Sequence, residues 1–155
     1  MANLPQPTSA RSRRAVTAIV RWLPLLAWMV LIYWLSAQPV VPHPGRAIGL
    51  HDHLVDYTAH AVLFGALTLL TWWALGDPGT PPPLLRRGRL AAALVWATFY
   101  AASDELHQIA VPGRCATFPD WLADVAGIFL AGATLWAWER RVRQKTPAKG
   151  ALDYV

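Results

Sequence analysis

Four long apolar segments alternate with short polar segments along the chain. We predict helices that span a membrane at about residues 15–36, 54–75, 90–110 and 118–138. Each has close to the roughly 20 residues that a helix needs to cross a bilayer. Proline and glycine interrupt the joins between them, at residues 38–49, 76–83 and 111–113. The pattern predicts an all-α, integral membrane four-helix bundle.

The two ends of the chain are polar. We expect residues 1–14 to form an N-terminal tail and residues 139–155 a basic C-terminal tail, with the four-span membrane domain over residues 15–138. The first apolar run is longer than the core of a usual signal peptide, and Ser36–Pro39 is a poor cleavage site. We therefore expect this run to be retained as a span.

Composition and charge agree with a membrane protein. The chain is 55% hydrophobic and 15% charged, which argues against an ordinary soluble domain. Its formal charge of +5 does not indicate nucleic-acid binding, because the basic residues occur in short runs beside the apolar segments, as topology signals do. Twelve of the 14 basic residues fall on one side of the predicted bilayer, namely Arg11, Arg13, Arg14, Arg21, Arg86, Arg87, Arg89, Arg140, Arg141, Arg143, Lys145 and Lys149. Both termini are therefore predicted to be cytoplasmic.

This topology places most acids and all histidines on the outer side. Six of the nine acids lie there, namely Asp52, Asp56, Asp104, Glu105, Asp120 and Asp124. The histidines are His43, His51, His53, His60 and His107, and Arg46 and Arg114 share this side. An unpaired acid within a bilayer costs about 2–3 kcal/mol, so several acids together need partners or a wet cavity. We expect a polar cluster at the extracytoplasmic end.

Helical spacing allows these groups to meet. Three polar pairs are four residues apart and share a helix face: Asp56 with His60, Asp104 with Gln108, and Asp120 with Asp124. Gly127 and Ala131 continue the face of the last pair with small residues, which lets a neighbouring helix approach closely.

Three motifs resemble those of the VanZ-like family of small membrane proteins. The end of the first span is Trp34-Leu35-Ser36-Ala37-Gln38-Pro39, and the second span opens with Asp56-Tyr57-Thr58-Ala59-His60, which resembles the family's Asp-Lys-x-x-His motif. The third motif consists of Asp104-Glu105-Leu106-His107-Gln108, Pro112-Gly113-Arg114, Asp120, Asp124 and Gly127. Three positions depart from the family pattern: Tyr57 stands where lysine is usual, Asp124 where asparagine is common, and Cys115 where a small polar residue is frequent.

The resemblance implies a multi-pass protein of the bacterial cytoplasmic membrane. Some VanZ-like proteins are linked to resistance to the glycopeptide teicoplanin, whose target is a cell-wall precursor on the outer face of the membrane. An outward-facing polar site fits such a role.

Nine residues form the candidate ligand-binding set, namely Asp56, His60, Asp104, Glu105, His107, Gln108, Arg114, Asp120 and Asp124. In one interpretation Arg114 neutralises the acids and locks the bundle, because its planar fork suits carboxylates. In the other, Arg114 receives a phosphate or carboxylate of an outer-leaflet ligand. No catalytic residue is assigned, and Asp104, Glu105 and His107 are the candidates for proton transfer.

Metal and thiol chemistry have weaker support. Asp56, His60, Asp120 and Asp124 could bind a divalent cation, but no paired His-x-x-x-His or Glu-x-x-His signature accompanies them, so no metal or cofactor is predicted. A nucleophile made of Cys115 and His107 lacks an orienting group. Residues 51–53 are expected to be a solvated loop.

We expect the polar cluster to form a pocket that binds the anionic headgroup of an envelope lipid or of a lipid-linked cell-wall precursor. Such binding could also affect susceptibility to teicoplanin-type glycopeptides. Membrane lipids are the expected partners, and nucleic acids are not. Two other classes stay open. One is a membrane-embedded hydrolase or transferase acting on lipid-linked phosphates, and the other is a non-catalytic assembly partner for envelope proteins.

Overall fold

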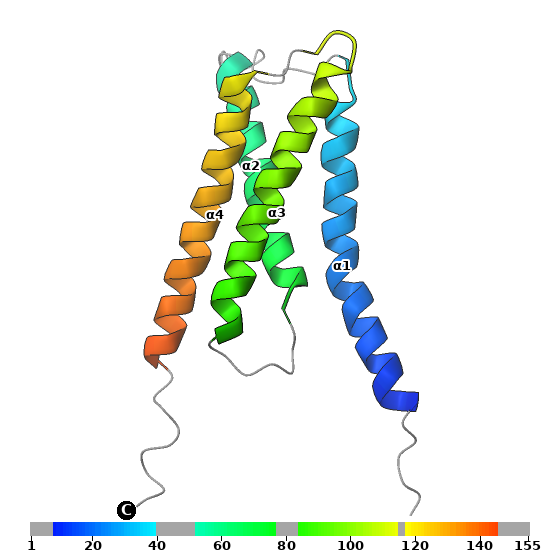
Figure 1. The fold of residues 1–155 in the computed structure, drawn as a ribbon, viewed down its shortest axis with the longest axis vertical. Helices are drawn as coiled ribbons and strands as arrows, with labels where there is room; N and C mark the ends of the chain where they lie inside the picture. The colour runs from blue at the N-terminus through cyan, green and yellow to red at the C-terminus, as the bar shows by residue number, and fades with distance from the viewer. Residues whose placement is uncertain (1–7, 40–51, 77–83, 115–116, 146–155) are drawn as a thin grey trace, which may run out of the picture.

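The computed structural model describes residues 8–39, 52–76, 84–114 and 117–145. Its four helices are α1 (Thr8–Ser36), α2 (Asp52–Ala74), α3 (Leu84–Ile109) and α4 (Phe118–Lys145) (Figure 1). The prediction of an all-helical chain with four helices is confirmed. Arg46, Cys115, His43 and His51 lie outside the described residues.

The helices run up and down, so each end of the molecule gathers ends from all four. The start of α1, the end of α2, the start of α3 and the end of α4 are at the same end of the molecule (Figure 1). The largest interface joins α2 and α4, and α1 packs more loosely at the side. Helix α1 contains Pro24, which lacks an N–H group for the helical ladder, and its N-terminal part diverges from the other helices (Figure 1).

Small residues explain the tight packing of α2 against α4. A Cβ atom on Gly127 would overlap the backbone of Ala61, and one on Gly65 would lie 3.2 Å from the carbonyl oxygen of Gly127. The sequence-based expectation of a close helix approach at Gly127 is confirmed. Lipid is as apolar as the helix surfaces, so the hydrophobic effect does not drive helices together within it. Close packing of backbones at small residues contributes to helix association instead.

The outer surface of the bundle is apolar, unlike that of a soluble protein, although the interior also holds a hydrophobic core around Leu25, Phe64 and Leu67. Large apolar side chains such as Val30, Val95 and Leu130 are exposed on the outside of the helices. Several polar side chains are buried instead, namely Ser36, Thr68, Thr71, Asp104, Gln108, Asp124 and Glu139. An apolar exterior of this extent marks a surface that meets lipid.

Three helices contain stretches long and apolar enough to cross a membrane: Ile19–Ser36, His53–Ala74 and Phe118–Val142. Helix α3 does not match them in composition, because its last turns carry Asp104, Glu105, His107 and Gln108. It nevertheless runs beside α2 and α4 over much of their length (Figure 1). Arg86, Arg87 and Arg89 in its first turns lower its apolar character further. The polar residues of its last turns are ones that the sequence assigns to the site.

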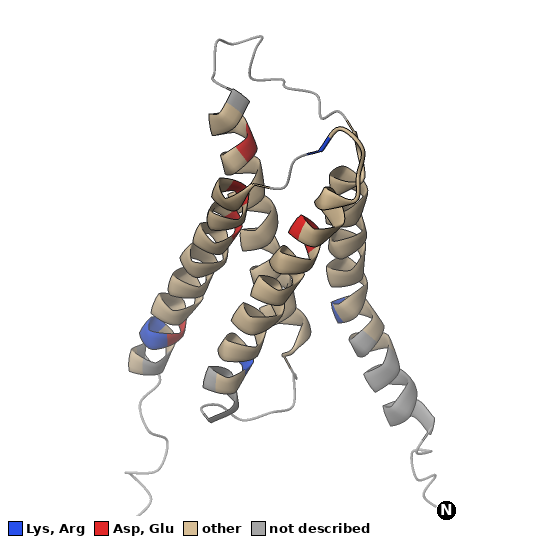
Figure 2. Cartoon of the chain, turned by 45° about the horizontal axis from the view of Figure 1, so that its top comes forward, with Lys and Arg blue, Asp and Glu red and all other residues tan. Residues whose placement is uncertain are grey.

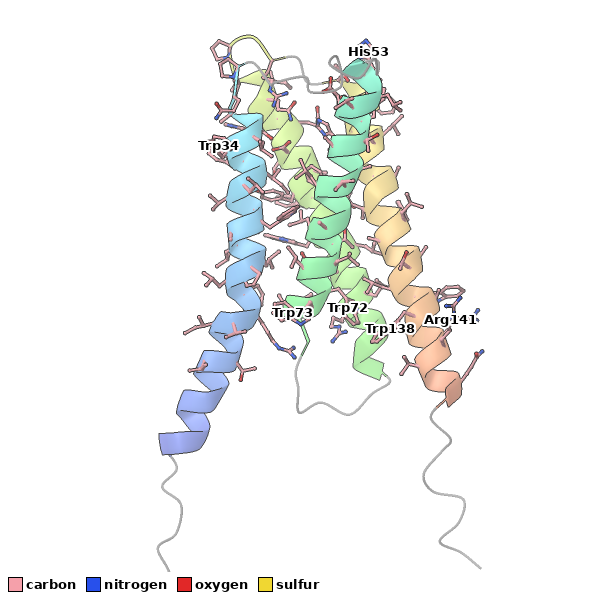
Figure 3. All side chains as sticks on the ribbon, turned by 180° about the vertical axis from the view of Figure 1, so that it is seen from behind. Trp34, His53, Trp72, Trp73, Trp138 and Arg141 are labelled. Atoms are coloured by element: carbon pink, nitrogen blue, oxygen red, sulfur yellow. The ribbon has the colours of Figure 1, made fainter. Side chains whose placement is uncertain are left out.

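Acidic residues gather mainly toward one end of the bundle and basic residues toward the other (Figure 2), with Arg114 and Glu139 as exceptions. We call the end with Arg21, Arg89 and Arg140 the basic end, and the opposite end, with Asp56, Asp104, Glu105, Asp120 and Asp124, the acidic end. Trp72, Trp73 and Trp138 lie at the basic end, whereas Trp34 and His53 lie toward the acidic end (Figure 3). Tryptophans at both ends are typical of the aromatic belts at the two membrane interfaces.

Candidate functional site

A cavity of about 720 Å³ opens among the helix ends at the acidic end. Its lining comes from the end of α1, the start of α2, the end of α3, the turn that follows α3 and the start of α4. The described lining residues are Ile32, Leu35, Ser36, Pro39, His53, Asp56, Tyr57, Ala59, His60, Leu63, Phe64, Asp104, Gln108, Gly113, Arg114, Thr117, Pro119 and Asp120. Apolar residues line its deeper part, and polar groups surround them.

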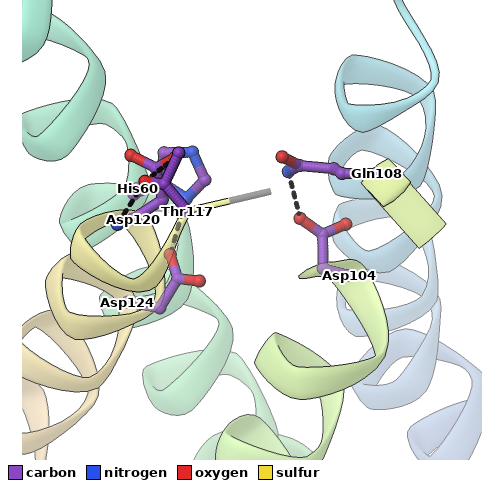
Figure 4. Close-up of polar contacts among 6 residues, drawn as sticks. All are labelled: His60, Asp104, Gln108, Thr117, Asp120 and Asp124. Atoms are coloured by element: carbon purple, nitrogen blue, oxygen red, sulfur yellow. Dashed lines mark hydrogen bonds and ion pairs between the residues drawn. The ribbon is translucent and has the colours of Figure 1, made fainter. Parts of the chain in front are cut away.

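One wall carries a histidine–aspartate pair that joins α2 to α4. His60 Nδ1 lies 2.8 Å from Asp124 Oδ1, with the histidine side chain 15% exposed and the aspartate side chain fully buried (Figure 4). The close approach of Gly127 to Ala61 brings the two residues within reach, because each lies within one turn of that contact. His60 therefore bonds across the interface to Asp124. The shared helix face of His60 and Asp56 did not predict this partner.

Asp120 has a structural role at the start of α4. The hydroxyl of Thr117 donates to Asp120 Oδ2 at 2.7 Å, and the backbone N–H of Asp120 donates to Thr117 Oγ1 at 3.3 Å. This reciprocal arrangement caps the first turn of the helix. One turn further on, Asp124 points to the same wall, so a single helix start supplies both carboxylates.

The facing wall comes from α3. Gln108 Nε2 donates to Asp104 Oδ2 at 2.9 Å, which confirms the pair expected from helical spacing. Both side chains are buried, with exposures of 2% for Gln108 and 5% for Asp104. Figure 4 shows this pair opposite the His60–Asp124 pair and Asp120, and Asp104, Gln108, His60 and Asp120 all line the cavity.

Glu105 turns from α3 toward the first wall. One carboxylate oxygen of Glu105, one ring nitrogen of His60 and one carboxylate oxygen of Asp124 all lie within 4.8 Å of one another. Glu105 Oε1 and Asp124 Oδ2 are buried oxygens that have no hydrogen-bond partner among the described residues. The residue types and the spacing of these three side chains suit a metal ion.

Arg114 reaches the cavity by way of a tight turn. The N–H of Arg114 donates to the carbonyl oxygen of Val111 at 3.1 Å, and Gly113 between them has a φ of +85°, which favours glycine. The turn aims Arg114 at α1, where its Nη2 donates to the carbonyl oxygen of Leu35 at 2.9 Å. Its described hydrogen bond thus goes to a helix C-terminus and not to a carboxylate. This bond ties the turn after α3 to α1, as bundle locking requires, but it is not the pairing with the acids that the first interpretation expected.

The remaining site candidates divide between the cavity and its margin. Asp56 lines the cavity, whereas His107 is not among its described lining residues and stacks on Tyr33 of α1 at 4.5 Å between ring centroids. The expectation of a loop over residues 51–53 is wrong for Asp52 and His53, because α2 begins at Asp52. His53 lines the cavity and stacks on Tyr57.

Tyr57, Thr117 and the carbonyl oxygen of Leu35 are site features that the sequence reasoning did not assign. Tyr57 was treated only as a departure from a family pattern, and a signal for Thr117 was available in its spacing of three residues from Asp120. No sequence signal identifies a backbone carbonyl as the partner of Arg114.

Comparison with known proteins identifies a family. A family model described as VanZ/LLP1 matches residues 7–139, a range that holds all nine candidate site residues. No curated protein and no solved structure matches the chain.

Proposed function

The chain belongs to the VanZ/LLP1 family, and from this premise we propose that its cavity binds the anionic headgroup of an envelope lipid or of a lipid-linked cell-wall precursor. Both sources share a phosphate attached to a membrane-embedded chain. The single observation that carries the proposal is a cavity of about 720 Å³, lined by ionisable groups, between helices whose outer faces are apolar. An amphiphile has the matching distribution of polar head and apolar tail.

We propose that the cavity faces the outside of the bacterial cytoplasmic membrane and that all four helices span it. The support is that Arg21 bonds to Gly76 just after α2, and that Arg89 and Arg140 lie near the start of α3 and the end of α4, opposite the cavity. Cytoplasmic flanks carry the excess of basic residues. Lipids of the outer leaflet and exported cell-wall precursors would then meet the cavity directly.

The two walls suit different parts of a headgroup. Arg114 supplies a guanidinium whose Nε is buried and lacks a partner among the described residues, and a phosphate oxygen is a strong acceptor for such a donor. Asp104 and Asp56 supply carboxylates that accept hydrogen bonds from hydroxyl groups beside the phosphate. The binding of a cell-wall precursor would change susceptibility to glycopeptides that target it.

Lipid retention tests the proposal. The full-length protein would be purified in a mild detergent from a bacterial membrane, and bound lipid would be measured by native mass spectrometry. Arg114→Gln and Asp104→Asn should each lower retention of phosphate-bearing lipid by about tenfold, a change of roughly 1.4 kcal/mol in binding. Arg140→Gln is the matched control, because it removes the same charge at the basic end. Added phospholipid and added lipid-linked precursor, in separate samples, distinguish the two sources.

Equal retention by wild type and Arg114→Gln would contradict the proposal, and so would an equal loss in Arg140→Gln.

A hydrolase or transferase acting on lipid-linked phosphates is the second candidate. It is favoured by Glu105 Oε1, a buried carboxylate oxygen without a partner among the described residues, as a proton acceptor would need. Release of labelled phosphate or transfer of the labelled group would favour this enzyme over a binding protein.

A further inference from the structure

We infer that His60, Glu105 and Asp124 bind one divalent transition-metal cation at the acidic end. Each residue comes from a different helix, α2, α3 and α4 respectively, and each offers one ligand atom within 4.8 Å of the other two. Metal sites in helical membrane and soluble bundles are commonly built from inward-facing side chains of several helices. The inference goes beyond the proposed function and does not depend on it.

Buried oxygens without partners are the second observation. Asp124 is fully buried, and although its Oδ1 bonds to His60, its Oδ2 has no partner among the described residues. The same holds for the buried Oε1 of Glu105. Carboxylate oxygens placed in an apolar environment need a positive charge or donors to offset the loss of water. A cation between the two carboxylates supplies that charge at both.

The donor set indicates the kind of metal. One imidazole nitrogen suits Zn²⁺, Fe²⁺ or Mn²⁺ better than Mg²⁺ or Ca²⁺, and two carboxylates balance the charge of a divalent ion. Ligands that bind one such ion at about 2.0–2.2 Å lie roughly 3–4 Å from each other. The spacing of up to 4.8 Å among the three residues is close to that range, so small side-chain rotations would close the site.

The surrounding packing holds two of the ligands in place. The backbone contact between Gly127 and Ala61 fixes α2 against α4 within one turn of His60 and Asp124. Three protein ligands leave coordination positions open, and His60 lines the cavity. An oxygen ligand that enters the cavity, such as water or a phosphate, can complete the coordination.

Metal binding by the protein alone tests this inference. Full-length protein in detergent, without added lipid, would be treated with a chelator, freed of it, and titrated with Zn²⁺ or Mn²⁺ as the only addition. We expect one equivalent per chain for the wild type. Glu105→Gln and Asp124→Asn should weaken the affinity at least tenfold, whereas Asp104→Asn and Asp120→Asn, which remove a nearby negative charge but no metal ligand, should weaken it clearly less. X-ray absorption of the Zn²⁺ form should show nitrogen and oxygen ligands at about 2.0–2.2 Å.

Glu105→Gln keeps the experiment informative if other variants fold poorly, because Glu105 Oε1 has no hydrogen bond to lose among the described residues. Absence of stoichiometric Zn²⁺ and Mn²⁺ binding by the wild type would overturn the inference. Equal weakening in the Asp104→Asn and Glu105→Gln variants would also overturn it. Because no envelope lipid is added, absence of metal binding would not contradict the lipid proposal. Absence of lipid retention would likewise not contradict metal binding.

Discussion

The basic and acidic ends of the bundle hold their charged groups in different ways. At the basic end, the guanidinium carbon of Arg89 lies 3.6 Å from the ring centroid of Trp72, and that of Arg140 lies 4.1 Å from the ring centroid of Trp136. Arg21 donates to the carbonyl oxygen of Gly76 at the end of α2. Cation–π contacts and carbonyl partners of this kind hold basic side chains at a membrane interface.

At the acidic end, the charged groups point into the bundle and leave acceptors unused. Glu105 Oε1 and Asp124 Oδ2 are buried without partners among the described residues. Polar groups deeper in the bundle are satisfied within their own helix, as Thr68 and Thr71 show by donating to the carbonyl oxygens of Phe64 and Leu67. Cation–π contacts, carbonyl partners and hydrogen bonds within a helix therefore account for Arg21, Arg140, Thr68 and Thr71. They do not account for the buried oxygens of Glu105 and Asp124.

The largest effect expected from the comparison is an all-or-none difference in accessibility. In a Cys115→Ser background, Pro112→Cys at the acidic end should react in intact cells with a maleimide that cannot cross the membrane. Gln144→Cys at the basic end should react only after permeabilisation, because the basic end is expected to face the cytoplasm. Gel mobility after labelling measures both. The reverse pattern would place the cavity inside the cell and contradict the proposed function.

Helix packing should give the next largest effect. Gly127→Leu introduces a side chain where even a Cβ atom overlaps the backbone of Ala61, so α2 and α4 must separate. We expect a loss of about 3 kcal/mol in the free energy of unfolding, the upper part of the usual range for overpacking. Unfolding by denaturant in detergent micelles measures this loss.

Gly88→Ala is the matched control for that substitution. Gly88 lies on α3 near the basic end, and a Cβ atom there has no heavy atom within 4 Å among the described residues. Alanine favours a helix over glycine by about 1 kcal/mol, so this variant should be neutral or more stable. Equal destabilisation by the two variants would mean that the α2–α4 contact is not specific.

The His60–Asp124 pair should give a smaller loss. His60→Ala leaves Asp124 buried without its partner, and Asp124→Ala does the same to His60. Each variant should lose about 1–3 kcal/mol of unfolding free energy, the usual cost of an unsatisfied buried polar group. The double variant should lose less than the sum of the two, because neither residue then lacks a partner.

Chelator-treated protein in detergent is the sample for these measurements, so that metal binding does not contribute. Strictly additive losses would show that the 2.8 Å contact does not contribute to stability, and that helix packing alone holds α2 against α4.

Much of the fold was accessible from the sequence because hydropathy and helix spacing are local signals. The four helices follow from the lengths of the apolar segments, and the Asp104–Gln108 pair and the close approach at Gly127 follow from the helical period of about 3.6 residues. The start of α2 was misjudged because Asp52 and His53 are polar, although polar residues are common in the first turn of a helix.

The site was only partly accessible. Its residues could be named from their polarity in apolar surroundings, but their partners depend on how helices rotate against one another. Nothing in the spacing indicates that His60 bonds to Asp124 or that Glu105 joins them, because the three residues lie on different helices. The contact between His60 and Asp124 joins residues 64 positions apart in the chain.

The smallest expected effect is on stability, and it compares the same chemical group, an arginine guanidinium, at the two ends of the bundle. Arg21 and Arg114 each donate to a backbone carbonyl near the C-terminal end of a neighbouring helix, at Gly76 of the α2 end and at Leu35 of the α1 end. A positive charge at a helix C-terminus contributes about 0.3–1 kcal/mol. Arg21→Gln and Arg114→Gln should therefore lower the free energy of unfolding by similar small amounts.

The two arginine variants should differ in lipid retention. Arg114 lines the cavity and Arg21 does not lie among its described lining residues, so only Arg114→Gln should release phosphate-bearing lipid. Stability in detergent and native mass spectrometry on the same samples separate the two contributions. If both variants kept their lipid and lost equal stability, Arg114 would be an anchor like Arg21, and the acidic end would differ from the basic end only in its carboxylates and histidines.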